Sequence, residues 1–333
     1  MSLGLSAQDS SGGFASELNL VPQPQSISPQ GAPWRLPPSL YLHLPTSPLP
    51  GIRARAQIAV GQLEDLGMRT QLMASETLEP NQALLTNSPT VPRAWIKVGR
   101  PLRGAARKPE GYRLTIRDDG ALIEASDENG FYYAAQTIQQ LLENRQDMPG
   151  LVIEDGPLLP HRAVHLDFKG WPPTRSYLET TLDRLSHYRF NIVILEYEDY
   201  FLYNSQPGLS HPKALPPNYI VEIDTLAKER GITLVPLLHG LGNVGYILKL
   251  DPYRELREDP RYLQMFCPSH PSTLEIFTAM VEDLLACHSA PLFHIGGDPA
   301  RFLGQCPACQ ARARQLGGAR RCTSTTSGRP RGI

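Results

Sequence analysis

Acidic and histidine side chains recur in the second half of the chain, each just after a short apolar run such as Ile192–Leu195. The residues that follow such runs are Asp167, then Glu196, Glu198 and Asp199, then His239, and finally Asp298. Carboxylates and imidazoles accept and donate hydrogen bonds and move protons. If the runs are neighbouring parallel strands, their ends meet at one edge, and the set predicts a binding or catalytic site there.

The elements that would position these side chains alternate between strand and helix after His161. The strand candidates are Ala163–Phe168, Ile192–Tyr197, Ile232–Leu238 and Leu292–Ile295, and the helix candidates are Tyr177–Tyr188, Ile220–Arg230 and Ser272–Cys287. This alternation predicts βαβ units and a parallel sheet covered on both faces. A (β/α)8 barrel and a doubly wound sheet both carry sites at strand ends; the pattern favours the barrel, with about four strand–helix units present.

Residues 18–155 read as a separate small α+β domain. Apolar residues at helical spacing predict a helix over Ile52–Met68, and Ala94–Val98 is a short strand candidate. Tyr112–Ile116 and Ala121–Ala125 flank Asp118-Asp119-Gly120, which is typical of a hairpin. In the helix predicted over Phe131–Asn144, the side chains of Phe131, Ile138 and Leu142 should be buried.

Composition excludes several classes of protein. The net charge of -1 gives no electrostatic reason to bind nucleic acid or an anionic membrane. The longest apolar runs are far shorter than the roughly 18 residues of a membrane-spanning helix. Residues 1–17 lack the features of a signal peptide, and the five cysteines are sparse and odd in number, so we expect a cytoplasmic protein. Residues 1–17 and 317–333 are predicted to be disordered, and the latter resemble an out-of-frame ending.

Several sequence motifs, by their order and their spacing, resemble those of the β-N-acetylhexosaminidases of glycoside hydrolase family 20, in a bacterial subgroup. They are Gly130–Leu142, His161–Asp167, Glu196–Asp199, Phe266–Pro271, His294–Asp298 and Cys306–Cys309, within a resemblance that covers about Leu18–Gln310. The resemblance implies that an accessory α+β domain (18–155) precedes the first half of a TIM-barrel hydrolase domain (160–316). It also implies that the chain is C-terminally truncated, without barrel strands five to eight.

The family's chemistry is substrate-assisted, with the 2-acetamido oxygen of the sugar as the nucleophile. The resemblance assigns Asp298 to the carboxylate that orients the acetamide. The adjacent position, which carries the general acid in the family, is Pro299 here. Proline has no proton to donate, and a general acid typically contributes about 10²- to 10⁴-fold. We therefore expect impaired hydrolysis.

The same resemblance points to further sugar-binding positions. Arg162 matches the arginine that binds hydroxyls of the terminal sugar, or else it forms an ion pair with Asp167 on the barrel floor. The family's histidine and glutamate after the third strand are replaced by Asn243 and Gly245, neither of which titrates. The remaining candidates for substrate binding are Asp167, Glu198, Asp199 and His239. Glu198 and Asp199 either face the cleft or cap the following loop.

The pair Cys306-Pro-Ala-Cys309 offers two metal ligands, whereas a structural zinc site uses four. Cys267 and a histidine could complete such a site, but the sequence favours a packed pair of thiols. We therefore predict no metal and no cofactor.

Three hypotheses follow. The chain is a β-N-acetylhexosaminidase that removes terminal N-acetylglucosamine or N-acetylgalactosamine from glycans, impaired at Pro299; or a non-catalytic relative that binds carbohydrate or protein; or a truncated product without independent function. With four strands, the barrel would leave open edges, and a homodimer could close them. Because the sugar-enclosing walls would be absent, Pro299→Glu alone should restore little activity.

Overall fold

The computed structural model describes residues 18–93, 95, 102–143, 147–297, 300 and 302–316. The chain divides into two compact units: unit 1 comprises residues 1–160 with 187–189, and unit 2 comprises residues 161–186 and 190–333. Within the described part, no helix combines the length and apolar character needed to cross a bilayer. The predicted strand Ala94–Val98 falls outside the described residues except for Trp95.

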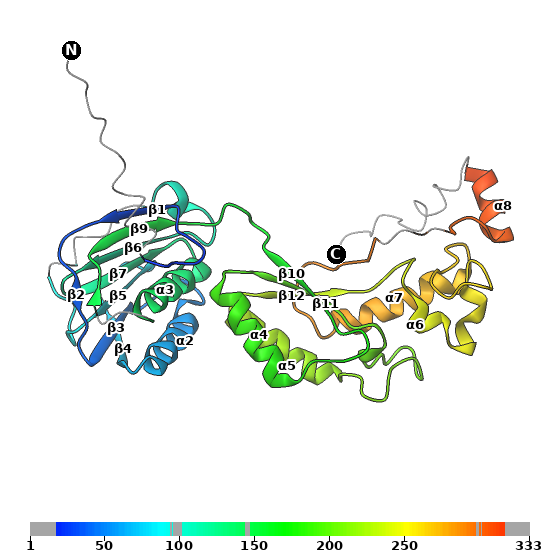
Figure 1. Cartoon of the computed structure of the whole chain (residues 1–333), viewed down its shortest axis with the longest axis horizontal. Helices are drawn as coiled ribbons and strands as arrows, with labels where there is room; N and C mark the ends of the chain where they lie inside the picture. Colours follow the sequence, from blue (N-terminus) through cyan, green and yellow to red (C-terminus); the bar gives the residue numbers. More distant parts are fainter. Residues whose placement is uncertain are drawn as a thin grey trace, which may run out of the picture. The chain divides into compact units, whose positions relative to one another are not determined.

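Unit 1 is built on a seven-stranded sheet in the order β1-β9-β6-β7-β5-β3-β4 (Figure 1). Its strands are β1 (Ser26–Pro29), β3 (Ser39–Pro45), β4 (Arg69–Ser75), β5 (Gln82–Thr86), β6 (Tyr112–Arg117), β7 (Gly120–Ala125) and β9 (Leu151–Asp155). The short strands β2 (Trp34–Arg35) and β8 (Asp147–Met148) form a separate pair. Strands β6 and β7 form the predicted hairpin, in which Arg117 pairs with Gly120 across the turn.

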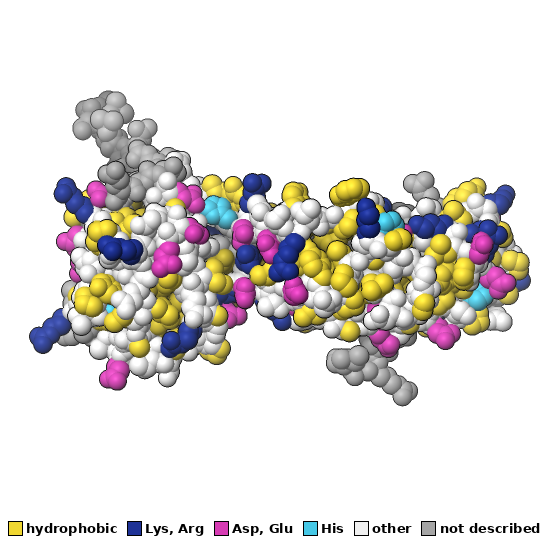
Figure 2. Space-filling model, turned by 90° about the horizontal axis from the view of Figure 1, so that it is seen from below, with side chains coloured by type: hydrophobic (Ala, Val, Ile, Leu, Met, Phe, Trp, Pro, Cys, Tyr) yellow, Lys and Arg dark blue, Asp and Glu magenta, His cyan; other side chains and the backbone are white. Residues whose placement is uncertain are grey.

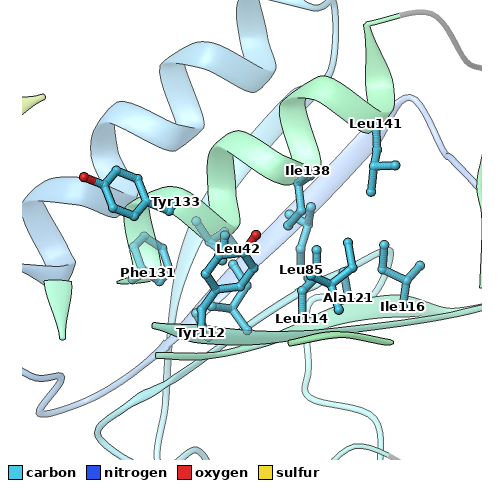
Figure 3. Packing of buried hydrophobic residues seen from close by; sticks show 14 of the residues in the cluster. Leu42, Leu85, Tyr112, Leu114, Ile116, Ala121, Phe131, Tyr133, Ile138 and Leu141 are labelled. Carbon is cyan, nitrogen blue, oxygen red and sulfur yellow. The ribbon is translucent and has the colours of Figure 1, made fainter. Parts of the chain in front are cut away.

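Two helices, α2 (Ile52–Asp65) and α3 (Glu128–Leu142), lie on one face of this sheet. Helix α3 begins after Asp127, whose carboxylate accepts a hydrogen bond from the backbone N–H of Gly130 at 2.8 Å. Figure 3 shows its apolar side chains directed at those of β6 and β7. Phe131, Ile138 and Leu142 are 1%, 3% and 8% exposed, so the sequence prediction of a buried helix face is confirmed.

Truncation of Ile138 tests this packing. Ile138→Ala should destabilise unit 1 by about 2–5 kcal/mol, and Ile138→Val by about 0.5–1.5 kcal/mol, because each deletes buried methyl groups and leaves a cavity. Gln57→Ala, at an exposed position of α2, is the control and should change stability by less than about 0.5 kcal/mol. The measurement is urea unfolding, monitored through hydrogen exchange of the β6–β7 amides. Equal effects of the three substitutions would contradict the packing.

Unit 2 contains three parallel strands in the order β10-β11-β12, with the bounds Ala163–Asp167, Ile192–Glu196 and Thr233–Leu237. The connecting helices are α4 (Arg175–His187) and α5 (Pro217–Glu229), and α7 (Pro271–Leu285) follows the third strand. The first and last residues of these strands and helices agree with the predicted bounds to within three residues. Figure 1 shows α4 and α5 on the same side of the three strands. Unit 2 is therefore a partial (β/α)8 barrel, and the described part forms no closed barrel.

The fourth strand is shorter than the sequence indicates. At the predicted strand Leu292–Ile295, the described residues form only a parallel bridge between Leu237 and His294. The backbone N–H of His294 donates to the carbonyl of Pro236, and that of Gly240 to the carbonyl of Ile295. Gly296 then adopts a positive φ of 62°, which ends the extended conformation immediately after Ile295.

The two faces of this short sheet differ. Val193, Leu195 and Leu234 point to the face covered by the helices and belong to the buried core of unit 2. Residues in register on the opposite face include His165 beside Ile194, and Asp167 beside Glu196. Along β10 the residues of this opposite face, Ala163, His165 and Asp167, are all exposed. At β10, this second face therefore exposes the polar side chains of His165 and Asp167, whereas Glu196 beside them on β11 is buried.

Charged side chains of both signs are scattered over the face of the molecule that Figure 2 shows. On the face seen in Figure 2, Lys and Arg side chains are interspersed with Asp and Glu over both units. This mixture agrees with the net charge of -1.

Candidate sugar-binding site

Three acidic side chains and a lysine meet at the carboxyl ends of β10 and β11. The Nζ atom of Lys169 lies 3.6 Å from Asp167, 3.2 Å from Glu196 and 3.3 Å from Glu198. The backbone N–H of Lys169 also donates to the Asp167 carboxylate at 2.8 Å, which fixes the loop after β10. The Lys169 ammonium thus lies among three carboxylates that come from two different strand ends.

Glu196 is the buried centre of this group. Its Oε2 lies 3.0 Å from Nε2 of His165, and its Oε1 lies 2.9 Å from Nε2 of His239. Its side chain is only 5% exposed, whereas that of His165 is 46% exposed. Burial by itself would raise the pKa of Glu196, but hydrogen bonds and charge from His239 and Lys169 lower it to about 2. Glu196 is therefore an anion that orients the groups around it.

The pKa values of Glu198 and Lys169 are both raised, but for different reasons. Burial raises the pKa of Glu198, although the Lys169 charge and hydrogen bond counteract it. Burial would lower the pKa of Lys169, but the hydrogen bond to Glu196 and the surrounding carboxylates raise it. Lys169 therefore stays charged, while Glu198 holds a proton more readily than a solvated glutamate does.

Asp199 and Asn243 lie apart from the Lys169 cluster. The Asp199 carboxylate accepts a hydrogen bond at 3.0 Å from Nζ of Lys249, just after helix α6 (Gly245–Leu248). Asn243 is exposed in the preceding loop, with a positive φ of 54°. At Gly245, an added Cβ would lie 2.5 Å from Nε2 of Gln264, so the Gln264 side chain fills the place next to this position.

Arg162 is at the other end of the first strand. It immediately precedes β10, so the five residues of that strand lie between it and the loop that carries Lys169. Its backbone carbonyl accepts from Asn191, and its backbone N–H donates to the Asn191 side chain at 2.9 Å. The structure thus brings together Asp167, Glu198 and His239 through Glu196 and Lys169, and places Arg162 at the amino end of the sheet.

Asp298 and Pro299 lie outside the described residues, but the segment that leads to them is defined. Gly296 packs against His239 so closely that an added Cβ would lie 2.5 Å from the Nδ1 atom and 2.9 Å from the Cα atom of His239. The end of the fourth strand therefore runs beside the histidine that contacts Glu196.

Sequence reasoning missed two contributors to this cluster, Lys169 and His165, and gave Glu196 no specific role. Glu196 had been noted at a strand end, and His165 shares the side of β10 that carries Asp167, because side chains two residues apart point the same way. Lys169 gave no periodic signal, since it lies in a loop. The same loop presents Trp171, which is 77% exposed and offers an apolar ring face.

Comparison with known proteins agrees with this architecture. Residues 17–156 match the family model described as glycosyl hydrolase family 20, domain 2. Hexosaminidase D from Bos taurus is 34% identical over 146 residues, which are 43% of this chain and 42% of that protein. A β-hexosaminidase from Akkermansia muciniphila is 23% identical over 245 residues, covering 62% of this chain and 49% of that protein. The chain thus spans less than half the length of these relatives.

Solved structures resemble the chain over most of its length. A chitobiase from Flavobacterium johnsoniae aligns with a TM-score of 0.72 and 19% identity, covering 93% of this chain and 50% of that one. A β-N-acetylhexosaminidase from Bacteroides fragilis aligns with a TM-score of 0.69 and 20% identity, covering 93% and 63%. The fold is a small α+β domain followed by the parallel strands of a partial (β/α)8 barrel, as in these solved structures. More particularly, residues 17–156 belong to domain 2 of glycoside hydrolase family 20, and the chain is similar to β-hexosaminidases of that family.

Proposed function

We propose that this protein binds terminal β-linked N-acetylhexosamine of glycans at the carboxyl ends of β10, β11 and β12, and that its hydrolytic activity is impaired. The observation that carries the proposal is the Lys169 cluster, in which Asp167, Glu196 and Glu198 from two strand ends surround one ammonium group. Sugar hydroxyls need acceptors and donors held in fixed positions, and this cluster supplies both. Family membership supports the class of ligand, and Pro299 at the general-acid position supports the impairment.

Binding of free N-acetylglucosamine to the chain tests the first half of the proposal. Asp167→Asn and Glu198→Gln should each weaken binding at least about tenfold, because each removes a charged hydrogen-bond acceptor worth roughly 1.5–3 kcal/mol. Asp251→Asn is the matched control, since that carboxylate is 79% exposed in the 3-10 helix η3 (Asp251–Leu256) and should leave binding unchanged. Isothermal titration calorimetry, with glucose as the ligand that lacks the acetamide, measures the affinities.

A folded chain that binds N-acetylglucosamine no better than glucose would contradict the proposal. So would equal affinities for the Asp167, Glu198 and Asp251 variants. Because the Asp167 side chain is 43% exposed, Asp167→Asn should not unfold the sheet, and loss of binding in that variant can be assigned to the site.

A homodimer formed through the edge of the partial barrel stays a prediction. In the described part, β10 is the terminal strand of its sheet. A parallel edge can pair with another chain. Light scattering over a range of protein concentrations measures the oligomeric state, and a monomer throughout would contradict the prediction.

A further inference from the structure

A second cluster of reactive side chains lies on other elements of unit 2. It consists of Glu258, Cys267, Cys306 and Cys309, and we call it the thiol cluster. The ligand atoms of these four residues all lie within 4.8 Å of one another. Three of the residues are buried, and Cys306 is intermediate in exposure. No disulfide joins the described cysteines.

Two structural pieces bring these residues together. Glu258 and Cys267 flank a small antiparallel bridge between Arg257 and Phe266, in which the Cys267 N–H donates to the carbonyl of Leu256 at 2.6 Å. Cys306 and Cys309 lie at the start of helix α8 (Pro307–Leu316). The backbone N–H of Cys309 donates to Sγ of Cys306 at 3.3 Å, which caps this helix.

The distances fit four ligands around one ion. Sγ of Cys267 lies 3.4 Å from Sγ of Cys306 and 3.6 Å from Sγ of Cys309. In a tetrahedral zinc site with Zn–S bonds of about 2.3 Å, the sulfur atoms lie about 3.8 Å apart. A disulfide would need about 2.05 Å between two sulfur atoms and would leave the third thiol and the carboxylate without a role.

Glu258 brings a carboxylate to the three thiols, and hydrogen bonds fix its position. Its side chain is 1% exposed. Oε1 accepts hydrogen bonds from the backbone N–H groups of Gln305 and Cys306 at 2.7 and 3.0 Å, and Oε2 lies 3.1 Å from Sγ of Cys309. The two N–H donors orient the carboxylate so that Oε2 points at the thiols. A buried carboxylate is costly unless it is paired or coordinates a metal.

We propose that Glu258, Cys267, Cys306 and Cys309 form a tetrahedral binding site for Zn²⁺. Thiolates and a carboxylate are ligands that zinc accepts, and a set of four protein ligands is the closed arrangement of a structural site. Binding replaces the three thiol protons, which are released to solvent. The ion would fasten α8 to the rest of unit 2, because Cys309 is the residue of that helix that is buried. This inference does not depend on sugar recognition.

The sequence favoured a packed thiol pair, and the proposed zinc site is the alternative that metal analysis distinguishes from it. Two cysteines three residues apart supply half a site, and the other half comes from Cys267 and, in place of the histidine considered, Glu258. The residues are far apart in the sequence, so the spacing alone did not disclose the set.

Metal analysis of the untagged full-length chain, purified in the presence of a reductant, tests the proposal. We expect about one zinc ion per chain, measured by inductively coupled plasma mass spectrometry. The Cys267→Ser and Cys309→Ser variants should lose the metal. Glu258→Gln should weaken Zn²⁺ binding more than about tenfold, measured in competition with a chelator. Even residues that only support a metal ligand typically contribute 10- to 100-fold to metal affinity. Cys287→Ser is the control, because Cys287 is buried outside the cluster and its variant should keep the zinc.

A second measurement uses the unaltered chain, in case a serine variant does not fold. Co²⁺ added to the metal-free chain should give the visible absorption of a tetrahedral ion and thiolate-to-cobalt charge transfer. Chelator should accelerate tryptic cleavage at Arg312 or Arg314 in α8, and Zn²⁺ should reverse this. A folded chain that holds neither Zn²⁺ nor tetrahedral Co²⁺, or one in which two of these cysteines form a disulfide, would overturn the proposal.

Discussion

A natural β-linked disaccharide of N-acetylglucosamine should be hydrolysed at least about 10²-fold less efficiently than an activated aryl β-N-acetylglucosaminide. The glycosidic oxygen of the disaccharide must be protonated as it leaves, and a general acid typically contributes about 10²- to 10⁴-fold to that step. Pro299 has no proton to donate. The aryl leaving group needs little protonation, so its turnover isolates the defects that do not involve the acid.

Pro299→Glu should raise turnover of the disaccharide by less than about tenfold. Asn243 and Gly245 remain unable to titrate, and His165 and Asp167 stand exposed on β10 rather than enclosing a sugar ring. Without enclosure, the acetamide is not held in a near-attack geometry, a contribution that reaches several kcal/mol. The measurement is kcat/KM for both substrates with the unaltered chain and with the variant. Asp251→Asn, a substitution away from the site, is the control for effects of mutagenesis and purification.

Efficient hydrolysis of the disaccharide by the unaltered chain would contradict this account and would mean that another group donates the proton. Glu198 would then be the first candidate, because burial raises its pKa and it lies at the strand ends. In that event Glu198→Gln should abolish turnover of the disaccharide, whereas it should affect the aryl substrate through KM and spare its kcat.

Glu196→Gln should destabilise the partial barrel by about 1–3 kcal/mol at pH 7. The substitution removes the charge that Lys169 and His239 contact, and the buried His239 loses a charged acceptor, whereas Lys169 is half exposed and keeps Asp167 and Glu198 as partners. Hydrogen exchange of the β10–β12 amides measures the effect in unit 2 separately from unit 1. Glu222→Gln is the control, since that carboxylate is 51% exposed and pairs with Arg175 at the surface.

The same residue predicts a dependence of stability on pH. The pKa of Glu196 is lowered from 4.5 to about 2 in the folded chain. Its contribution is therefore complete above about pH 4.5 and is lost as the pH falls toward about 2, because the unfolded chain binds the proton more readily. The unaltered chain should lose stability over this range, and Glu196→Gln should lose less. Parallel losses in both proteins would show that another group carries the acid sensitivity.

Elements with strong local patterns could be predicted from the sequence. The hairpin β6–β7 has alternating residues around Asp119-Gly120, and α3 has its apolar residues on one side. Strand β4 was missed because its residues, Arg69–Ser75, are exposed and polar at several positions. It pairs in parallel with β3 across α2, a pairing that depends on distant residues.

The candidate site was predicted in its location and only partly in its composition. Strand ends indicated where Asp167, Glu198 and His239 would meet, since parallel strands bring equivalent ends together. The partners that fix their charge could not be deduced, because Lys169 lies in a loop and contacts three carboxylates from two separate strand ends. Three members of the thiol cluster were considered together from the sequence, and Glu258 was missed because it meets Cys309 only after the chain has folded.

The close approach of Gly296 to His239 also limits how this region can change during evolution. A side chain at position 296 would meet both the imidazole and the backbone of His239, and the positive φ of 62° further disfavours any residue but glycine. Substitution at 296 would therefore displace the histidine from Glu196, as if residue 239 itself had mutated. The two positions should show epistasis: Gly296→Ala should be damaging beside His239 and partly relieved beside alanine, which removes the contact with the imidazole but not the contact with the backbone or the positive φ.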